Sequence, residues 1–145
     1  MIFLDANIFL RFVAPAETAA QKRMQDTAEY VFGLLDRSQL EATTSEVVLH
    51  EVCYVLTSKK QYSLTAAQAI TAIEPILRLR SLKFPSGDRE IYLRALEVWK
   101  SNPRLEFSDS VIAARCETNG WELATFDEQL GSLPNLTRWN PAPTA

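Results

Sequence analysis

The alternation of short apolar runs with longer helical patterns is the feature that most constrains the fold of this chain. Each apolar run has the length of a strand, and most of the helical patterns are long enough to cross back over a sheet. The expected strands are Ile2–Leu4, Leu40–Thr43, Ser81–Phe84, Glu122–Phe126 and Leu136–Trp139. The expected helices are Asn7–Val13, Glu17–Arg37, Ser45–Lys59, Ser63–Arg80, Asp88–Ser101 and Ser108–Asn119, with a single turn at Asp127–Leu130. This alternation predicts an α/β fold with a parallel sheet and helices on both faces.

Several residues mark where these helices begin, bend or end. Pro15 stops the first helix, because proline cannot continue the helical hydrogen bonding. Ser63 or Thr65 is the expected N-cap of the fourth helix, and Pro75 is expected to kink it. Gly120 is a natural C-cap, since glycine adopts the left-handed conformation without strain.

The length of the chain is that of one compact domain. It has 145 residues, of which 47% are hydrophobic, and a chain of this size buries a core without disulfides. We expect one domain over residues 1–140 and a flexible tail over residues 141–145. Cys53 and Cys116 fall in apolar helical patterns and are expected to be reduced core thiols.

Charge and hydropathy exclude some classes of protein. The net charge of −3 argues against a general nucleic-acid-binding protein, so a nucleic acid would need a local basic patch. Arg11 is one candidate, either for contact with RNA or for balancing a nearby acid. Charged residues interrupt the N-terminal apolar stretch, and no run approaches the roughly 18 apolar residues of a membrane span. We therefore expect a cytoplasmic protein.

Two aspartates follow predicted strands directly. Asp5 ends the run "IFLD" and Asp127 ends "LATFD". Functional sites of open parallel sheets form beyond the carboxyl ends of the strands, where both aspartates are expected. Each also precedes a helix, so an N-cap is the alternative interpretation.

Two further acids lie on predicted helices. On the helix from Ser45, an apolar face is formed by Val48, Val52, Val55 and Leu56. Glu51 falls at the edge of that face and Glu46 points away from it. Asp109 falls in the apolar stripe of its own helix. A charged carboxylate that points inward is costly unless it is paired or binds a cation. The alternative interpretations are that Asp109 caps its helix and that Glu51 bonds to an arginine or lysine.

Four carboxylates in one pocket would repel one another unless a cation joined them. Oxygen ligands alone select hard ions such as Mg²⁺ or Mn²⁺. Such ions bind phosphate oxygens and activate water for attack at phosphorus. Convergence of Asp5, Glu51, Asp109 and Asp127 would therefore suit a hydrolytic nuclease, but the acids are scattered along the chain and their spacing alone does not establish the site.

Four motifs in succession resemble those of the PIN-domain ribonucleases, in particular the VapC-type toxins of bacterial toxin–antitoxin pairs. They are "FLDANIFLRF", "TTSEVVLHEVCYVL", "FSDSVIAARCETNGWELATFD" and "LPNLTRW", and they extend over nearly the whole chain. The resemblance implies a three-layer α/β/α sandwich with a mainly parallel central sheet. It also implies an RNA substrate, a homodimer and an antitoxin that blocks the site.

The resemblance assigns roles to individual residues. Asp5, Glu51, Asp109 and Asp127 match the catalytic and metal-binding acids of the family. Asn7 and Thr125 match polar positions that support the metal and its water. The family often has another acid or a small residue immediately before the third-motif aspartate; here it is Ser108, which we take as a supporting residue and not as a fifth acidic ligand.

Two hypotheses of different class follow. The first is a Mg²⁺- or Mn²⁺-dependent endoribonuclease toxin. The second is a catalytically silent PIN-like module that only binds a protein or RNA partner. Retention of all four acids argues against the second if the acids point inward, because unused buried carboxylates destabilise a fold.

Overall fold

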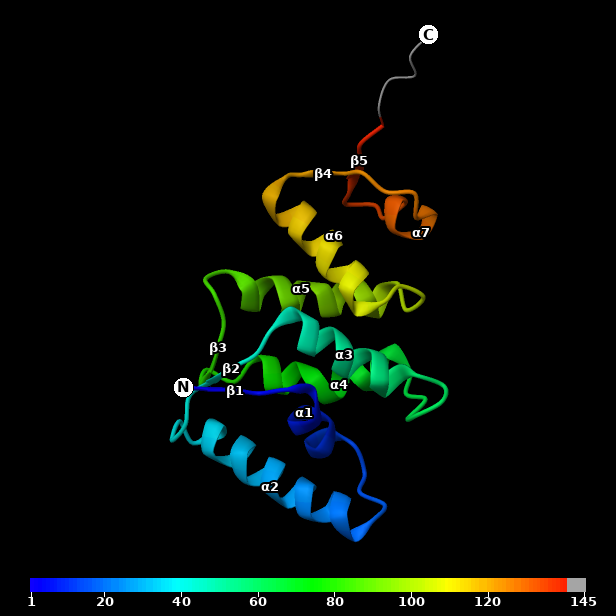
Figure 1. The fold of residues 1–145 in the computed structure, drawn as a ribbon. Coiled ribbons are helices and arrows are strands. Elements are labelled where there is room, and N and C mark those ends of the chain that lie inside the picture. Colours follow the sequence, from blue (N-terminus) through cyan, green and yellow to red (C-terminus); the bar gives the residue numbers. More distant parts are fainter. Residues whose placement is uncertain (141–145) are drawn as a thin grey trace. The chain divides into compact units, whose positions relative to one another are not determined.

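The computed structural model describes residues 1–140, so the predicted tail over residues 141–145 lies outside the described part. The chain forms two compact units, Met1–Arg89 and the part from Glu90 onward. Each unit has its own parallel sheet (Figure 1).

The first unit contains a three-stranded parallel sheet. Its strands are β1 (Ile2–Phe3), β2 (Ala42–Thr43) and β3 (Leu82–Lys83), and β2 lies in the middle. Ala42 of β2 is in register with Ile2 on one side and with Leu82 on the other. The strands lie inside the predicted ones but are shorter, although Leu4 and Ser81, just outside them, still share backbone hydrogen bonds of 2.9 Å with β2.

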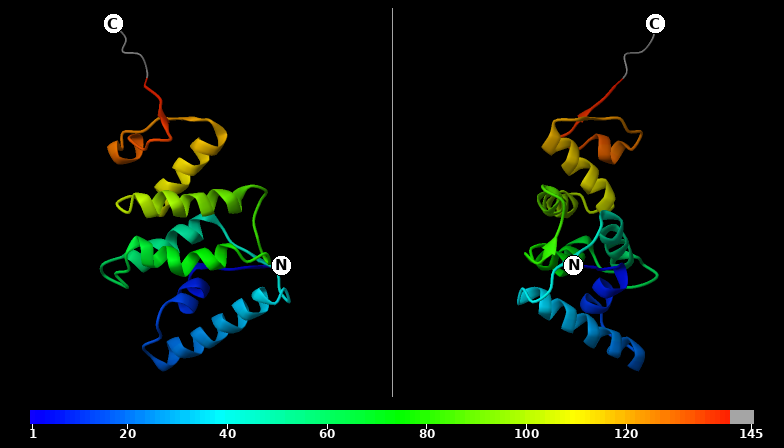
Figure 2. Two further views of the ribbon diagram at one scale, coloured as in Figure 1. Left: turned by 180° about the vertical axis from the view of Figure 1, so that it is seen from behind. Right: turned by 60° about the vertical axis from the view of Figure 1, so that its left-hand side comes forward.

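Four helices complete the first unit. They are α1 (Ala6–Val13), α2 (Ala19–Asp36), α3 (Glu46–Thr57) and α4 (Ala66–Leu77). Helix α1 contacts both α2 and α3, and α1 and α2 lie side by side in every view (Figures 1 and 2). The aromatic rings of Phe9 and Phe12 both contact Phe32 of α2, with centroids 5.6 and 4.4 Å from it, and this cluster joins the two helices.

The helix ends follow from the sequence signals. Thr65 is the N-cap of α4 and forms a capping box with Gln68, which decides between the two caps that the sequence allowed. Pro75 lies inside α4, as predicted. Gly120 adopts the left-handed conformation at the C-cap of α6, with φ of 67°.

The second unit contains most of α5 (Asp88–Ser101), followed by α6 (Phe107–Asn119), β4 (Glu122–Leu123), the short helix α7 (Glu128–Gly131) and β5 (Thr137–Arg138). Strands β4 and β5 are parallel, with Leu123 in register with Arg138. A small core joins α5, α6 and α7 through Val98, Ala113 and Leu130.

The predicted α/β class is confirmed by parallel strands that alternate with helices in both units. The two cysteines are free and buried, as predicted, and burial raises the pKa of the Cys53 thiol to about 12. No helix among residues 1–140 is long and apolar enough to span a bilayer.

Candidate active site

Asp5 lies at the point where β1 leads into α1. It is the N-cap of α1, and its Oδ1 accepts a hydrogen bond from the backbone N–H of Asn7 at 2.8 Å. Both residues are exposed. The capping interpretation is therefore correct, and one carboxylate oxygen of Asp5 is engaged in the cap.

A buried threonine holds the strand end that carries Asp5. The hydroxyl of Thr44, just beyond β2, donates a hydrogen bond of 2.8 Å to the carbonyl of Leu4, the residue before Asp5. Thr44 is only 6% exposed. A hydroxyl that is buried in this way has few alternative partners, so it restrains the backbone immediately before the acid. The sequence motifs gave no indication of this role.

Asp127 occupies the matching position in the second unit. It follows β4 and caps α7, with its Oδ1 accepting from the N–H of Leu130 at 2.9 Å. Its own N–H donates to the hydroxyl of Thr125 at 3.0 Å, whereas the role of Thr125 in supporting the metal and its water stays a prediction. Arg138 of β5 donates to the Thr125 carbonyl at 2.8 Å and forms two hydrogen bonds to Glu128, at 3.1 and 3.2 Å.

Asp109 is half-buried in the first turn of α6. Its Oδ2 accepts the N–H of Glu106, the N-cap residue, at 3.2 Å. The predicted apolar stripe is present in part, because Ala113 and Cys116 are buried, whereas Ile112 is 40% exposed. Asp109 therefore lies at the edge of the buried face and helps to begin the helix, while Ser108 beside it is also half-buried.

The predicted orientation of α3 is wrong. Its buried face is formed by Leu49, Val52, Cys53 and Leu56. This face is rotated toward Leu49 and Cys53, so Glu51 is exposed and Glu46 is half-buried. The sequence predicted that Glu51 lies beside the buried face and that Glu46 points to solvent. That prediction places Val48 and Val55 in the core, whereas both are only partly buried.

The four predicted acids are divided equally between the units. Asp5 and Glu51 belong to the first, and Asp109 and Asp127 belong to the second. Asp5 and Asp127 have the same local design, in which a parallel strand ends, an aspartate caps the next helix, and a side chain from beside the neighbouring strand restrains the preceding backbone.

The comparison with known protein families decides the assignment. A family model described as the PIN domain matches residues 2–136. The chain belongs to the PIN-domain family. This match covers the first unit from Ile2 and the second unit as far as Leu136, contains all four acids, and confirms the three-layer α/β/α class that the motifs implied. No curated protein matches the chain. PIN domains are in general metal-dependent nucleases that act on nucleic acids.

The donor chemistry of this PIN domain suits a hard divalent ion, because the acids offer carboxylate oxygens and three of them are exposed. Among residues 1–140, however, no group of three or more His, Cys, Asp or Glu side chains is gathered closely enough to hold an ion.

The first unit has a groove beside Asp5. It has a volume of about 390 Å³ and lies between α1 and α2, lined by Asn7, Ile8, Arg11, Ala20, Arg23, Met24 and Thr27. Arg11 was a candidate from the sequence, but Arg23 was not, because nothing in the sequence pattern shows that residues twelve positions apart share one groove.

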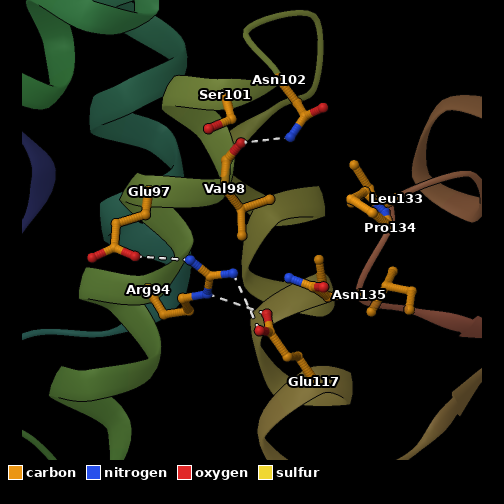
Figure 3. A pocket seen from close by; sticks show the side chains of 11 residues that line it. Arg94, Glu97, Val98, Ser101, Asn102, Glu117, Leu133, Pro134 and Asn135 are labelled. Carbon is orange, nitrogen blue, oxygen red and sulfur yellow. Dashed lines mark hydrogen bonds and ion pairs between the residues drawn. The ribbon is translucent and has the colours of Figure 1, made fainter.

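A smaller cavity of about 140 Å³ lies in the second unit between α5, α6 and the segment before β5. Arg94 lies between the carboxylates of Glu97 and Glu117 (Figure 3). It donates a hydrogen bond of 2.8 Å to Glu97 and one of 3.2 Å to each carboxylate oxygen of Glu117. These bonds raise the pKa of Arg94. Because its charge is already balanced, Arg94 ties α5 to α6 and does not mark a ligand site.

Proposed function

We propose that this PIN-domain protein is a divalent-metal-dependent endoribonuclease and the toxin of a toxin–antitoxin pair, acting in the cytoplasm. The observation that carries the proposal is the family match over residues 2–136, which contains Asp5, Glu51, Asp109 and Asp127 within the first three of the four motifs. The same match supports treating residues 1–140 as one nuclease domain.

The four acids take distinct roles in this proposal. Asp5, Asp109 and Asp127 hold Mg²⁺ or Mn²⁺, and Glu51 holds a second ion or orients the attacking water. Asn7 and Thr125 support this set, and the capping bonds of Asp5 and Asp127 keep their carboxylates oriented. When bound, the metal lowers the pKa of a water molecule and stabilises charge on the phosphate in transit.

The silent binding module is the competing function. The cost of buried acids was the argument against it, but Asp5, Glu51 and Asp127 are exposed, so keeping them costs the fold little. Two of them even stabilise helix N-termini as caps. Retention of the acids therefore does not separate the two functions, and a cleavage assay is required.

The deciding experiment measures cleavage of a mixed pool of RNA by purified protein with Mg²⁺, with Mn²⁺ and with EDTA. We expect cleavage with either ion and none with EDTA. Asp109→Asn should lower the rate by orders of magnitude, because it preserves the shape of the side chain but removes its charge. Asp36→Asn, at an exposed position in α2, is the matched control and should keep full activity. Intact RNA under all conditions with folded protein would favour the silent module.

The proposed partners are a second copy of the chain and an antitoxin. Part of the apolar surface of α2 and α3 is exposed, including Tyr30, Val47 and Tyr54, whereas Phe32 and Leu35 are buried within the first unit. Exposed apolar patches often mark interfaces. We expect a dimer by light scattering at tens of micromolar. We also expect growth arrest on expression, relieved by a protein encoded next door, and an arginine of that protein to pair with the acids.

A further inference from the structure

The groove between α1 and α2 carries two cations without a balancing acid. Arg11 is half-buried and Arg23 is exposed, and both line the groove. Neither guanidinium is paired with a carboxylate in the part of the chain that the structure describes. By contrast, Lys22, the neighbour of Arg23 on α2, is paired with Asp26 at 3.2 Å. In a chain of net charge −3, two unpaired arginines on one groove indicate an anionic ligand.

The rest of the groove is largely apolar. Ile8 of α1 and Met24 of α2 contribute apolar side chains, and no acidic residue lines it. Met24 is 47% exposed, although methionine is usually found in cores. A ligand that matches these walls has both a flat or apolar surface and a negative charge. A nucleotide has both, as a base with two faces and a phosphate.

The position of the groove connects it to the proposed cleavage site. Asn7 lines the groove, and its backbone N–H is the group that Asp5 caps at 2.8 Å. Groove and acid therefore share the first turn of α1. An RNA strand whose scissile phosphate lies at Asp5 would have its neighbouring nucleotide within reach of this groove.

We propose that the α1–α2 groove binds one nucleotide of single-stranded RNA next to the scissile phosphate, and this rests on the proposed ribonuclease function. Arg11 and Arg23 bind the phosphate, because guanidinium groups match phosphate oxygens in charge and geometry. Ile8 and Met24 contact the base. A base is available for such contact only when it is unstacked, so single-stranded RNA is the ligand.

Binding of a short fluorescent single-stranded RNA, followed by anisotropy in EDTA, tests this proposal without relying on cleavage. Arg11→Gln and Arg23→Gln should each weaken binding about tenfold, and each should reduce the slope of log affinity against log salt by about 0.7. Lys22→Gln is the matched control, since it removes the same charge from the adjacent residue outside the groove. It should change affinity less than twofold. Met24→Ser should weaken binding without changing the salt slope.

The outcomes separate this proposal from the ribonuclease function. Equal loss with Lys22→Gln and Arg23→Gln would overturn the groove, because only general charge would then matter. The double variant Arg11→Gln/Arg23→Gln gives a second test, provided that it keeps the melting temperature of the wild type. Unchanged RNA affinity in this variant would also overturn the proposal. Loss of antitoxin binding together with unchanged RNA affinity would assign the groove to the antitoxin. Absence of metal-dependent cleavage would refute the proposed function, whereas the anisotropy result depends on neither metal nor cleavage.

Discussion

The two strand-end aspartates are built alike but held in place by different chemistry. In the first unit, the neutral hydroxyl of Thr44 restrains the backbone before Asp5 from a buried position. In the second unit, a charged side chain, that of Arg138, restrains the backbone before Asp127, and its charge is balanced by the exposed Glu128.

Some arginines of the two units also differ in whether they are paired with a carboxylate. In the second unit, Arg94 and Arg138 are both paired with acids and join elements of structure. In the first unit, a neutral hydroxyl holds the strand end, and Arg11 and Arg23 line the α1–α2 groove with no carboxylate partner among residues 1–140. Both units thus contain paired cations, since Lys22 and Arg78 of the first unit are paired with Asp26 and Glu74 at 3.2 Å, and Arg11 and Arg23 differ from these two as candidates for ligand binding.

The largest expected effect tests whether the two aspartates are functionally equivalent. Asp5→Asn and Asp127→Asn should each reduce metal-dependent RNA cleavage by at least about a hundredfold, because in the proposed function each removes a charge that binds the metal. Asparagine is also a good N-cap, so thermal stability should change little. Rates are measured under single-turnover conditions, with Asp36→Asn as control. A loss confined to one variant would show that the shared local design does not imply a shared role.

If the proposed metal site exists, bound Mn²⁺ should stabilise the protein. At a Mn²⁺ concentration 100 times the dissociation constant, the stability gain is about 2.7 kcal/mol. We expect the melting temperature to rise with Mn²⁺ in the wild type and not in Asp5→Asn or Asp127→Asn. Differential scanning calorimetry provides the measurement. A full rise in both variants would place the ion elsewhere.

Substitutions at Thr43, in β2, and at Thr44, just beyond it, distinguish an effect on protein stability from an effect on the position of Asp5. Thr44→Val removes the hydrogen bond to Leu4, and Thr43→Val removes a similar bond of 2.7 Å to the carbonyl of Lys83 in β3. Each should cost about 1 kcal/mol in denaturant unfolding. Only Thr44→Val should also slow cleavage, because only Leu4 precedes the acid. An equal effect of the two on cleavage would contradict a positioning role for Thr44.

The sequence was sufficient for the order of the elements and for the placement of Asp5 and Asp127. Strand–acid–helix boundaries are local signals, since an apolar run, a capping side chain and a helical period are all read within a few residues. The orientation of α3 was not predictable in the same way. Its valines make almost the whole helix apolar, so the sequence does not define a single buried face, and the packing against α1 and α4 decides it.

The partners of the site residues also could not be predicted. Thr44 meets Leu4 forty positions away, and Arg138 meets Thr125 thirteen positions away. Such contacts depend on strand pairing, which single-sequence periodicity does not give. The groove with Arg23 is of the same kind, because it exists only where α1 and α2 lie together (Figure 2).

The smallest expected effect concerns the charged support in the second unit. Hydrogen bonding to Arg138 lowers the pKa of Glu128 from 4.5. A lowered carboxyl pKa adds stability that is present above pH 4.5 and is lost as the pH falls through the folded-state value. Glu128→Gln should thus melt slightly below the wild type at pH 7, and the difference should shrink as the pH falls below 4.5. It should also shrink at high salt, since Glu128 is exposed. Thr44→Val is the control, because its neutral hydrogen bond gives a difference from wild type that does not change over the same pH range. If the Glu128→Gln difference were equally constant, the second strand end would be held by something other than this charge pair.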